Sequence, residues 1–278
     1  MVEIPRPFLK WAGGKAQLIP EILKRIPEEF SAYHEPFLGG GAVFFALFRQ
    51  GILDNKPVYL SDNNPELINA FRVVRDEAEQ LLKKLAKLRN KNNSHDYYRI
   101  RDQRPRSPVN RAARLIYLNR TCYNGLYRVN SRGRFNVPFG RYKNPRIYDP
   151  ENILAVSRAL QEVNIHLEDF EKVLERASAG DFVYFDPPYY PVSETANFSS
   201  YTSSGFSQKD HERLAEVFEA LVEKGVFVME SNSDTEFTRQ TYRRWHLHRV
   251  LAKRAINSNP SGRGAIAELI ITSYPTGG

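Results

Sequence analysis

Short runs of β-branched and aromatic residues alternate with longer amphipathic stretches along the chain. Turn residues bound each short run, as is typical of strands. In the longer stretches apolar residues recur at helical spacing. The predicted strands are 58–60, 163–167, 182–185, 226–229 and 268–272, with another around His246 and His248. The predicted helices are 17–25, 41–50, 65–88, 150–162 and 208–223. This alternation predicts an α/β fold with a largely parallel sheet.

Residues 65–149 interrupt this rhythm and are expected to form an inserted domain. A long charged helix comes first, and an Asn- and Lys-rich turn and a basic stretch with little strand character follow it. The sequence GLYRVNSRGRFNV then predicts a β-hairpin. Its turn is expected near Ser131, Arg132 and Gly133, with glycine supplying any positive φ. Residues 1–64 and 150–278 are expected to form the α/β domain.

Positive charge is concentrated in the same insertion. Residues 97–146 hold thirteen Arg or Lys and one acid, Asp102, a net charge of +12, whereas the whole chain carries +8 and the remainder therefore −4. Arg alternates there with Tyr, Asn, Phe and Gly, a pattern that favours a polyanion over an ordinary solvated face. Nucleic acid is therefore the expected partner.

Cysteine and histidine usage exclude several classes of protein. The single cysteine, Cys122, can form no internal disulfide, which indicates a reducing cytoplasm. The six histidines are scattered and match no metal-ligand spacing, so no metal site is expected. The N-terminus lacks an apolar signal core and no apolar run could span a bilayer, so neither secretion nor a membrane is expected. Nothing indicates an obligate protein partner.

The strongest candidate for chemistry is Asp186-Pro187-Pro188-Tyr189, which follows the apolar strand FVYF. At the carboxyl end of a strand in an open α/β sheet, side chains face the ligand crevice. Two prolines stiffen the backbone, so the Asp186 carboxylate and the Pro187 carbonyl form a rigid pair of acceptors. Such a pair suits the two N–H groups of an exocyclic nucleobase amine, with Tyr189 stacked on the base. A Pro-rich turn that merely ends a strand remains the alternative.

Two further motifs are candidates for binding a nucleotide-like cofactor. Pro36-Phe37-Leu38-Gly39-Gly40-Gly41 precedes an apolar helix, and Asp62 follows the next strand at a spacing that suits a ribose contact. An Asx turn or helix cap is the structural alternative for Asp62. In FLKWAGGK, Trp11 could lie near a sulfonium and Lys15 near a carboxylate, although core packing is the alternative for Trp11. The spacing excludes a P-loop.

Two segments rich in Ser, Asn or Gly lack any periodicity. Residues 193–206 have the composition of a mobile loop that could close over a ligand, and a loop without function is an equal alternative. Residues 258–263 could offer backbone amides and Arg263 to a phosphate. These two assignments are based on composition.

FLKWAGGK, PFLGGGAVFF, SDNNP, the basic insertion and DPPY together resemble, in motif and in order, the Dam family of DNA adenine methyltransferases. The resemblance covers nearly the whole chain and includes the stretch from Tyr123 to FNVPFGRY, which in that family reads GATC. It implies a Rossmann-like class I methyltransferase sheet with an inserted, mostly helical DNA-recognition domain that carries the hairpin. It also implies S-adenosylmethionine as cofactor, and duplex DNA with a flipped adenine as substrate.

The resemblance also assigns roles to individual residues. Catalysis falls to Asp186, Pro187, Pro188 and Tyr189. The implied cofactor contacts are Trp11, Lys15, Pro36, Phe37, Gly39, Asp62, Asp169, Phe170 and Asp186, with Asp169 and Phe170 at the adenine. The implied DNA contacts are Lys10, Tyr123, Asn124, Leu126, Arg128, Asn130, Pro138 and Tyr142, with Tyr123 and Asn124 wedged into the duplex. The family often has an acid where this chain has Arg134, so hairpin affinity and salt dependence are expected to differ.

Two alternatives remain open at the level of sequence. Transfer to the amino group of cytosine needs the same acceptor pair, although Asp before PPY favours adenine. A non-catalytic regulator that reads GATC on the same fold is the other alternative, and the intact Lys15, Asp62 and Asp186 argue against it.

Overall fold

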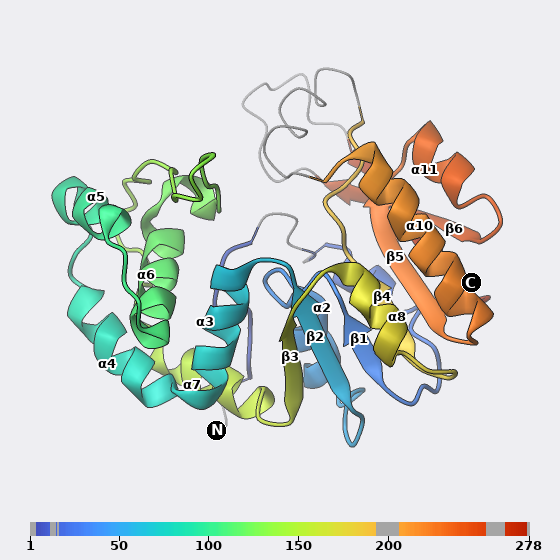
Figure 1. The fold of residues 1–278 in the computed structure, drawn as a ribbon, viewed down its shortest axis with the longest axis horizontal. Helices are drawn as coiled ribbons and strands as arrows, with labels where there is room; N and C mark the ends of the chain where they lie inside the picture. Colours follow the sequence, from blue (N-terminus) through green and yellow to red (C-terminus); the bar gives the residue numbers. More distant parts are fainter. Residues whose placement is uncertain (1–3, 12–14, 16, 193–205, 254–264, 277–278) are drawn as a thin grey trace. The chain divides into compact units, whose positions relative to one another are not determined.

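The computed structural model describes residues 4–11, 15, 17–192, 206–253 and 265–276 (Figure 1). Of the two segments for which composition predicts loops, 193–206 lies outside the described residues except for Phe206, and 258–263 lies outside them entirely. The α-helices are α1 Ile19–Leu23, α2 Ala42–Arg49, α3 Pro65–Asp76, α4 Ala78–Leu88, α5 Ser94–Asp102, α6 Pro108–Thr121, α7 Pro150–Ala159, α8 Val173–Arg176, α10 Gln208–Glu223 and α11 Glu236–Thr241. Two short 3-10 helices are η1 Tyr123–Gly125 and η2 Phe170–Lys172.

A seven-stranded sheet forms the framework of the α/β fold. Its strands are β1 Tyr33–Glu35, β2 Val58–Asp62, β3 Val163–Leu167, β4 Phe182–Phe185, β5 Phe227–Ser233, β6 His246–Lys253 and β7 Ala265–Thr272. Their order is β3-β2-β1-β4-β5-β7-β6. The pairs β1·β2, β1·β4 and β4·β5 are parallel, and β7 is antiparallel to both β5 and β6. This is the predicted Rossmann-like architecture, with the direction of strand order reversing between β1 and β4.

The strands predicted from the sequence are confirmed, and β5 extends four residues beyond its predicted end. The short central strand β1 was not predicted, because its sequence YHE is polar although all three residues are buried. The single helix expected over 65–88 is wrong. The chain breaks at Glu77, whose φ of −133° and ψ of 32° are not helical. Packing of α3 and α4 on α6 here overrides good local helix propensity.

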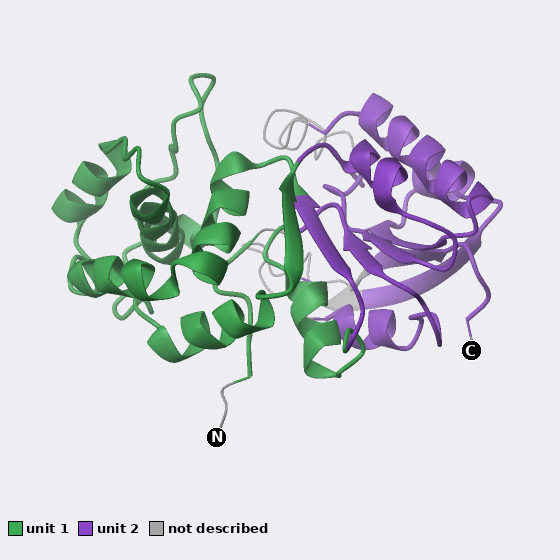
Figure 2. Cartoon of the chain, turned by 60° about the horizontal axis from the view of Figure 1, so that its bottom comes forward, with its two compact units in different colours: residues 1–14, 39–54, 62–167 green, residues 15–38, 55–61, 168–278 purple. Residues whose placement is uncertain are grey.

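The chain divides into two compact units (Figure 2). The first contains residues 1–14, 39–54 and 62–167, and therefore holds α2 to α7, β3 and the basic segment. Helix α6 is its central helix and contacts α3, α4 and α5. One apolar cluster joins Tyr97 and Ile100 of α5, Tyr117 and Leu118 of α6, and Phe135 of the hairpin. The hairpin is thus anchored on the helices through its apolar side chains.

The second unit contains residues 15–38, 55–61 and 168–278, with β1, β4 to β7 and nearly all of β2. Its core lies between the sheet and α10, where Leu214, Phe218 and Leu221 meet Val228 of β5 and Ile271 of β7. Helix α10 begins with a capping box between Ser207 and Asp210. Val183 and Phe185 of β4 belong to the same cluster, so both β4 and β5 are packed into this core.

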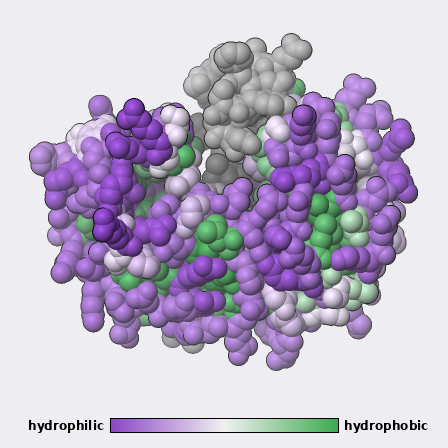
Figure 3. Space-filling view, viewed as in Figure 1, coloured by the Kyte–Doolittle hydropathy of each residue, from purple (hydrophilic) through white to green (hydrophobic). Residues whose placement is uncertain are grey.

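No helix among the described residues is long and apolar enough to cross a membrane. Hydrophilic side chains cover most of the face shown in Figure 3, and the apolar ones form small, separate patches.

Candidate active site and nucleic-acid interface

Three neighbouring parallel strands of the second unit end at the same edge of the sheet. β1 leads into Pro36 and Phe37, β4 leads directly into Asp186, and β5 ends with the polar run Glu230 to Ser233. The β4·β5 register pairs Phe185 with Glu230. In open α/β sheets this carboxyl edge, next to a reversal of strand order, is where ligands bind.

Asp186 is the central charged group at this edge. Its Oδ1 accepts a hydrogen bond from Ser231 Oγ at 3.1 Å and lies 2.6 Å from Lys15 Nζ. Desolvation raises the pKa of Asp186, and Lys15 and Ser231 oppose that rise. Lys15 is 5% exposed and Asp186 21% exposed, so the ammonium is shielded from water while the carboxylate stays partly accessible. The sequence predicts a cofactor carboxylate as the partner of Lys15 and does not predict this ion pair.

The rest of the DPPY motif is held around the same pair. Pro187 is buried, Pro188 is exposed, and Tyr189 is half-buried. The Tyr189 hydroxyl donates to Glu268 Oε2 at 2.9 Å, and Lys15 Nζ lies 4.4 Å from the centroid of its ring. The tyrosine ring is therefore fixed at both its edge and its face.

Phe37 and Phe170 come together beside this edge. Their rings stack with centroids 5.3 Å apart, and Phe170 is 4% exposed. Asp169 caps the short helix η2 by accepting from the Glu171 backbone and pairs with Arg213 at 3.3 Å. The Arg213 guanidinium lies 4.5 Å from the Phe170 ring centroid. The Asp-Phe pair suggested by the resemblance thus forms one cluster with Phe37, and Arg213 is a member that the sequence did not suggest.

The glycine turn and Asp62 belong to the first unit. Gly39 and Gly41 have φ of +48° and +70°, and a Cβ on Gly39 would lie 2.9 Å from Trp11 Cδ1. Asp62 accepts from Gly39 N at 3.1 Å and from Asn64 N at 2.9 Å, and Asn64 caps α3. Burial raises the pKa of Asp62. Asp62 thus forms an Asx-type turn, as its structural alternative predicts, and the same carboxylate fixes the glycine turn.

Asn119 of α6 joins two of the segments expected at DNA. Its side-chain amide bonds both the N–H and the carbonyl of Lys10, at 2.7 and 2.6 Å, and donates to the Gly125 carbonyl at 2.9 Å. Lys10 Nζ lies 4.7 Å from the Tyr142 ring centroid, and the indole of Trp11 stacks on Tyr127 at 5.3 Å. The N-terminal motif and the segment 123–142 are therefore built together, and no local sequence pattern indicates Asn119.

The expected wedge residues protrude from this framework. Tyr123 is 54% exposed, and Asn124 has a φ of +53°. Leu126, expected to contact a base, is 39% exposed. The backbone N–H of Tyr123 donates to the carbonyl of Pro138 at 2.8 Å. The backbone that carries these exposed side chains is therefore held in place by a hydrogen bond to another segment.

The hairpin predicted from the sequence is present. Val129 and Phe135 form an antiparallel bridge, and Gly133 in its turn has a φ of +67°. Asn130 accepts from the backbone N–H groups of Arg132 and Arg134 and so stabilises the turn itself. Arg128 donates through Nε to Asn136 Oδ1 at 2.8 Å, which fixes an exposed guanidinium. Asn136 was not predicted to have this role.

The thirteen cations of the basic segment have two different uses. Some are structural: Arg114 bonds the last carbonyls of α5, Arg120 bonds the Phe8 carbonyl, and Arg111 pairs with Glu66. Others are exposed on the hairpin and the stretch after it, and these are Arg128, Arg132, Arg134, Arg141 and Lys143. Arg99, Arg104, Arg106 and Arg146 are exposed as well, so the stretch 128–143 holds five of the nine exposed cations of the basic segment.

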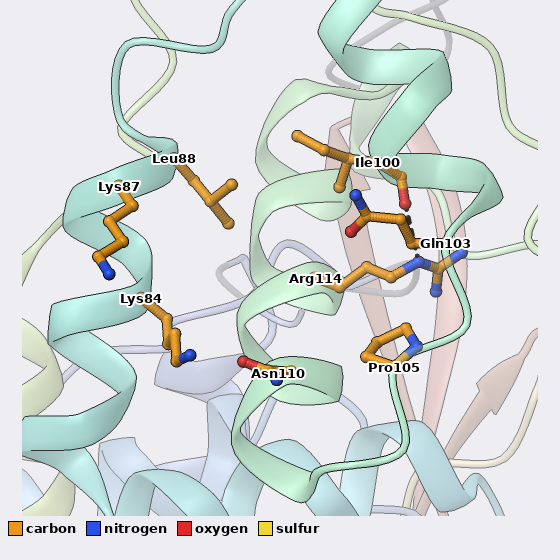
Figure 4. Close-up of a pocket in the computed structure, with 8 residues that line it drawn as sticks. All are labelled: Lys84, Lys87, Leu88, Ile100, Gln103, Pro105, Asn110 and Arg114. Carbon is orange, nitrogen blue, oxygen red and sulfur yellow. Dashed lines mark hydrogen bonds between the residues drawn. The ribbon is translucent and has the colours of Figure 1, made fainter.

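A pocket of about 290 Å³ lies among α4, α5 and α6 in the first unit (Figure 4). Leu88, Ile100 and Pro105 line it together with Lys84, Lys87 and Arg114. No residue predicted for the active site or the DNA interface is among its lining residues.

Ser231 and Asn232 are residues at the carboxyl edge that were not predicted from the sequence. The signal was present, because a polar run follows the apolar part of β5 just as DPPY follows β4. Glu230 in the same run is fully buried, and desolvation raises its pKa to about 7. Among the described residues, no cluster of His, Cys, Asp or Glu could hold a metal ion.

Comparison with known proteins identifies the family of this chain. The family model of the D12 class N6 adenine-specific DNA methyltransferases matches residues 11–256. A type II methyltransferase of Lactococcus lactis, M1.LlaDCHI, is 47% identical, with 97% of this chain and 95% of the relative covered. M.MjaIII of Methanocaldococcus jannaschii is 42% identical, with 97% and 99% covered, and the DNA adenine methylase of Escherichia coli K12 is 38% identical, with 97% and 96% covered. The chain belongs to the D12 class of N6 adenine-specific DNA methyltransferases.

Proposed function

We propose that this methyltransferase acts on an adenine flipped out of duplex DNA within GATC, and that Asp186 and the Pro187 carbonyl hold the reacting amine. The observation that carries the proposal is the Asp186 carboxylate at the carboxyl end of β4, fixed by Lys15 and Ser231. Membership of the family establishes S-adenosylmethionine-dependent methylation of DNA adenine as the activity. The roles of individual residues, base flipping and the recognition sequence are the proposal.

The residues of the site fit S-adenosylmethionine chemically. The fit rests on the glycine turn, where a Cβ on Gly39 would strike Trp11, and on the half-buried Asp62 beside it. Buried carboxylates suit ribose hydroxyls and a cationic ligand, and Lys15 suits its carboxylate. The residues proposed to hold the cofactor are Trp11, Lys15, Pro36, Phe37, Gly39, Asp62, Asp169, Phe170 and Asp186. When bound, S-adenosylmethionine supplies an electrophilic methyl group on its sulfonium.

The chain's own contribution to the reaction is to prepare the acceptor amine. The lone pair of adenine's amino nitrogen is delocalised into the ring, so the amine is a poor nucleophile. Two acceptors, Asp186 Oδ2 and the Pro187 carbonyl, would hold both N–H bonds and favour a tetrahedral nitrogen with a free lone pair. Tyr189 would stack on the base. Catalysis then consists of positioning and electrostatics without a covalent enzyme intermediate.

Recognition of DNA is proposed for residues 65–149. Arg128 can bind guanine bidentately, and Leu126 and Pro138 can contact a thymine methyl group. Tyr123 and Asn124, exposed on a fixed backbone, suit a wedge that offsets the cost of unstacking a base, which is a few kcal/mol. Lys10, Asn130 and Tyr142 complete the proposed interface. We propose further that the enzyme works in the cytoplasm, beside its DNA.

The product of the reaction tests the proposal directly. Purified enzyme is incubated with S-adenosylmethionine and a duplex that holds one GATC, and a second duplex carries the same bases in shuffled order. Mass spectrometry of the nucleosides is expected to show N6-methyladenine in the GATC duplex alone. Equal methylation of both duplexes would reject the specificity.

Base flipping has its own test. A duplex with 2-aminopurine in place of the target adenine is expected to gain fluorescence on binding, because unstacking relieves quenching. A duplex with 2-aminopurine several base pairs away is the control. Equal changes in the two duplexes would contradict flipping.

A further inference from the structure

We propose that Ser231 of β5 is a positioning residue that aligns the Asp186 carboxylate for the acceptor amine. The inference rests on the proposed role of Asp186. Ser231 lies in a fully buried part of β5, on the same face of the strand as the buried Met229 two positions earlier. Its partner on the neighbouring strand β7 is Ile270. It is one link in a chain of hydrogen bonds that ends at Asp186.

The direction of this chain follows from the donors available. Ser231 Oγ lies 3.1 Å from Asp186 Oδ1 and 2.8 Å from the Tyr184 hydroxyl. An ionised carboxylate can only accept, so Ser231 gives its single proton to Asp186. The Tyr184 hydroxyl must then donate to Ser231. Tyr184 and Ser231 are both completely buried, and successive hydrogen bonds in such surroundings strengthen one another.

The chain leaves the two oxygens of Asp186 unequal. Oδ1 receives both Ser231 and the ammonium of Lys15. No hydrogen bond to Oδ2 comes from the part of the chain that the structure describes, and the 2.6 Å approach of Lys15 is to Oδ1. Ser231 and Lys15 together set the rotation of the carboxylate, and the structure thereby assigns Oδ2 as the oxygen offered to the amine.

The same strand also holds the far end of the motif. Asn232 Oδ1 accepts from the Tyr190 backbone N–H at 3.0 Å, and its amide nitrogen donates to Glu230 Oε1 at 2.9 Å. Ser233 Oγ donates to the Tyr190 carbonyl. β5 therefore makes hydrogen bonds to residues on both sides of the two prolines. Ser231 is the residue of this strand that bonds to the reacting carboxylate.

A purely structural serine and a positioning serine differ in their effect on the pH dependence. Ser231 lowers the pKa of Asp186, so removal of its hydroxyl raises that pKa. Since the ionised form is required, the acid limb of the rate profile then moves to higher pH. The other titratable groups coupled to Asp186 are Lys15, Tyr33, Tyr184, Tyr189 and Glu230.

Single-turnover methylation of a GATC duplex between pH 5 and 9 tests the inference. For Ser231→Ala we expect a rate about 10- to 100-fold lower, the loss typical of partners that orient the ligands of a catalytic metal, with unchanged duplex affinity and an acid limb shifted to higher pH. Tyr184→Phe is expected to shift the limb in the same direction by less. Ser273→Ala is the matched control, because Ser273 Oγ accepts from the Val228 backbone of the same strand without reaching Asp186.

Two further variants separate the role of Ser231 from a loss of stability and from the titration of Glu230. Ser231→Ala leaves the Tyr184 hydroxyl buried without its partner, so the double variant with Tyr184→Phe is included and is expected to keep the shift while folding more stably. Glu230→Gln is expected to retain the acid limb, which assigns that limb to Asp186.

A Ser231→Ala enzyme that loses rate equally at every pH, or that matches the wild type, overturns the positioning role. Loss of the limb in Glu230→Gln overturns the assignment to Asp186. If the wild-type enzyme forms no N6-methyladenine, the proposed function itself fails, and that result is distinct from either of these.

Discussion

The DPPY site and the segment 123–142 contain similar kinds of side chain, but the two regions differ in how exposed these side chains are and in how they are held. At the DPPY site the charged pair is largely shielded from water: Lys15 is 5% exposed and Asp186 21% exposed, and two partners hold the Asp186 carboxylate. In 123–142 the functional side chains are exposed, and partners fix their backbone instead, as Pro138 does for Tyr123. Chemistry needs preorganised charge in a poorly hydrated place, whereas reading DNA needs side chains that can reach a base.

This contrast predicts that substitutions in the two regions impair different properties of the enzyme. A change at the DPPY site should lower the rate and leave affinity intact. A change in 123–142 should alter affinity or sequence preference and leave the intrinsic rate on bound DNA nearly intact.

Asp186→Ala is expected to have the largest effect and to lower the rate of methyl transfer by at least about 10²- to 10³-fold, the cost of losing one preorganised electrostatic contact. Duplex affinity should change little. Single-turnover assays and mobility shifts on the same GATC duplex measure both quantities. Loss of duplex binding in this variant would remove the distinction between the two regions.

Two glycines of the DNA segment form a matched pair. A Cβ on Gly140 would lie 2.5 Å from the Cys122 carbonyl oxygen, and backbone cannot give way cheaply. Gly140→Ala is therefore expected to lower the free energy of unfolding by about 1 to 3 kcal/mol and to weaken DNA binding. Gly133 has a φ of +67° but open space around it, so Gly133→Ala should cost only about 1 kcal/mol of backbone strain. Chemical unfolding of both variants checks the order, and equal losses would contradict it.

Arg128→Ala is expected to cost about 1 to 3 kcal/mol of discrimination at one base pair. The measurement is a competition between GATC and each singly substituted duplex. Asn136→Ala, which frees the guanidinium without removing it, should give a smaller loss at the same position. A uniform loss on all sequences would show that Arg128 contacts phosphate.

Arg132→Ala should have the smallest effect. Arg132 is exposed at the hairpin turn, and a phosphate contact would weaken binding equally on all sequences. The slope of log affinity against log salt should fall by about 1. A change in sequence preference would instead give Arg132 a role in reading bases.

Local patterns were sufficient to predict much of the fold. The turn residues around 131–133 predicted the hairpin, and apolar runs with helical stretches between them predicted the parallel sheet. Two features depend on tertiary packing and could not be predicted from local sequence. The break at Glu77 lies within strong helix-forming sequence, and β1 is polar because His34 and Glu35 have buried partners, Asp181 and Tyr33.

Residues of the candidate site could be predicted only where the neighbouring sequence also indicates the strand or helix on which they lie. Asp186 follows an apolar strand, so its place at the sheet edge could be inferred. Ser231 and Asn119 act through partners 45 and 109 residues away in sequence. Such partnerships depend on strand register and helix packing, which no local sequence pattern indicates.

Trp11 gives this protein a natural optical probe. Its indole touches the glycine turn at Gly39 and stacks on Tyr127 at the base of the hairpin segment. The other tryptophan, Trp245, packs against the apolar core beside α10. Fluorescence emission from Trp11 should therefore respond to a ligand at the glycine turn and to a ligand at the hairpin segment. A Trp245→Phe enzyme would allow binding at both places to be followed without any added dye.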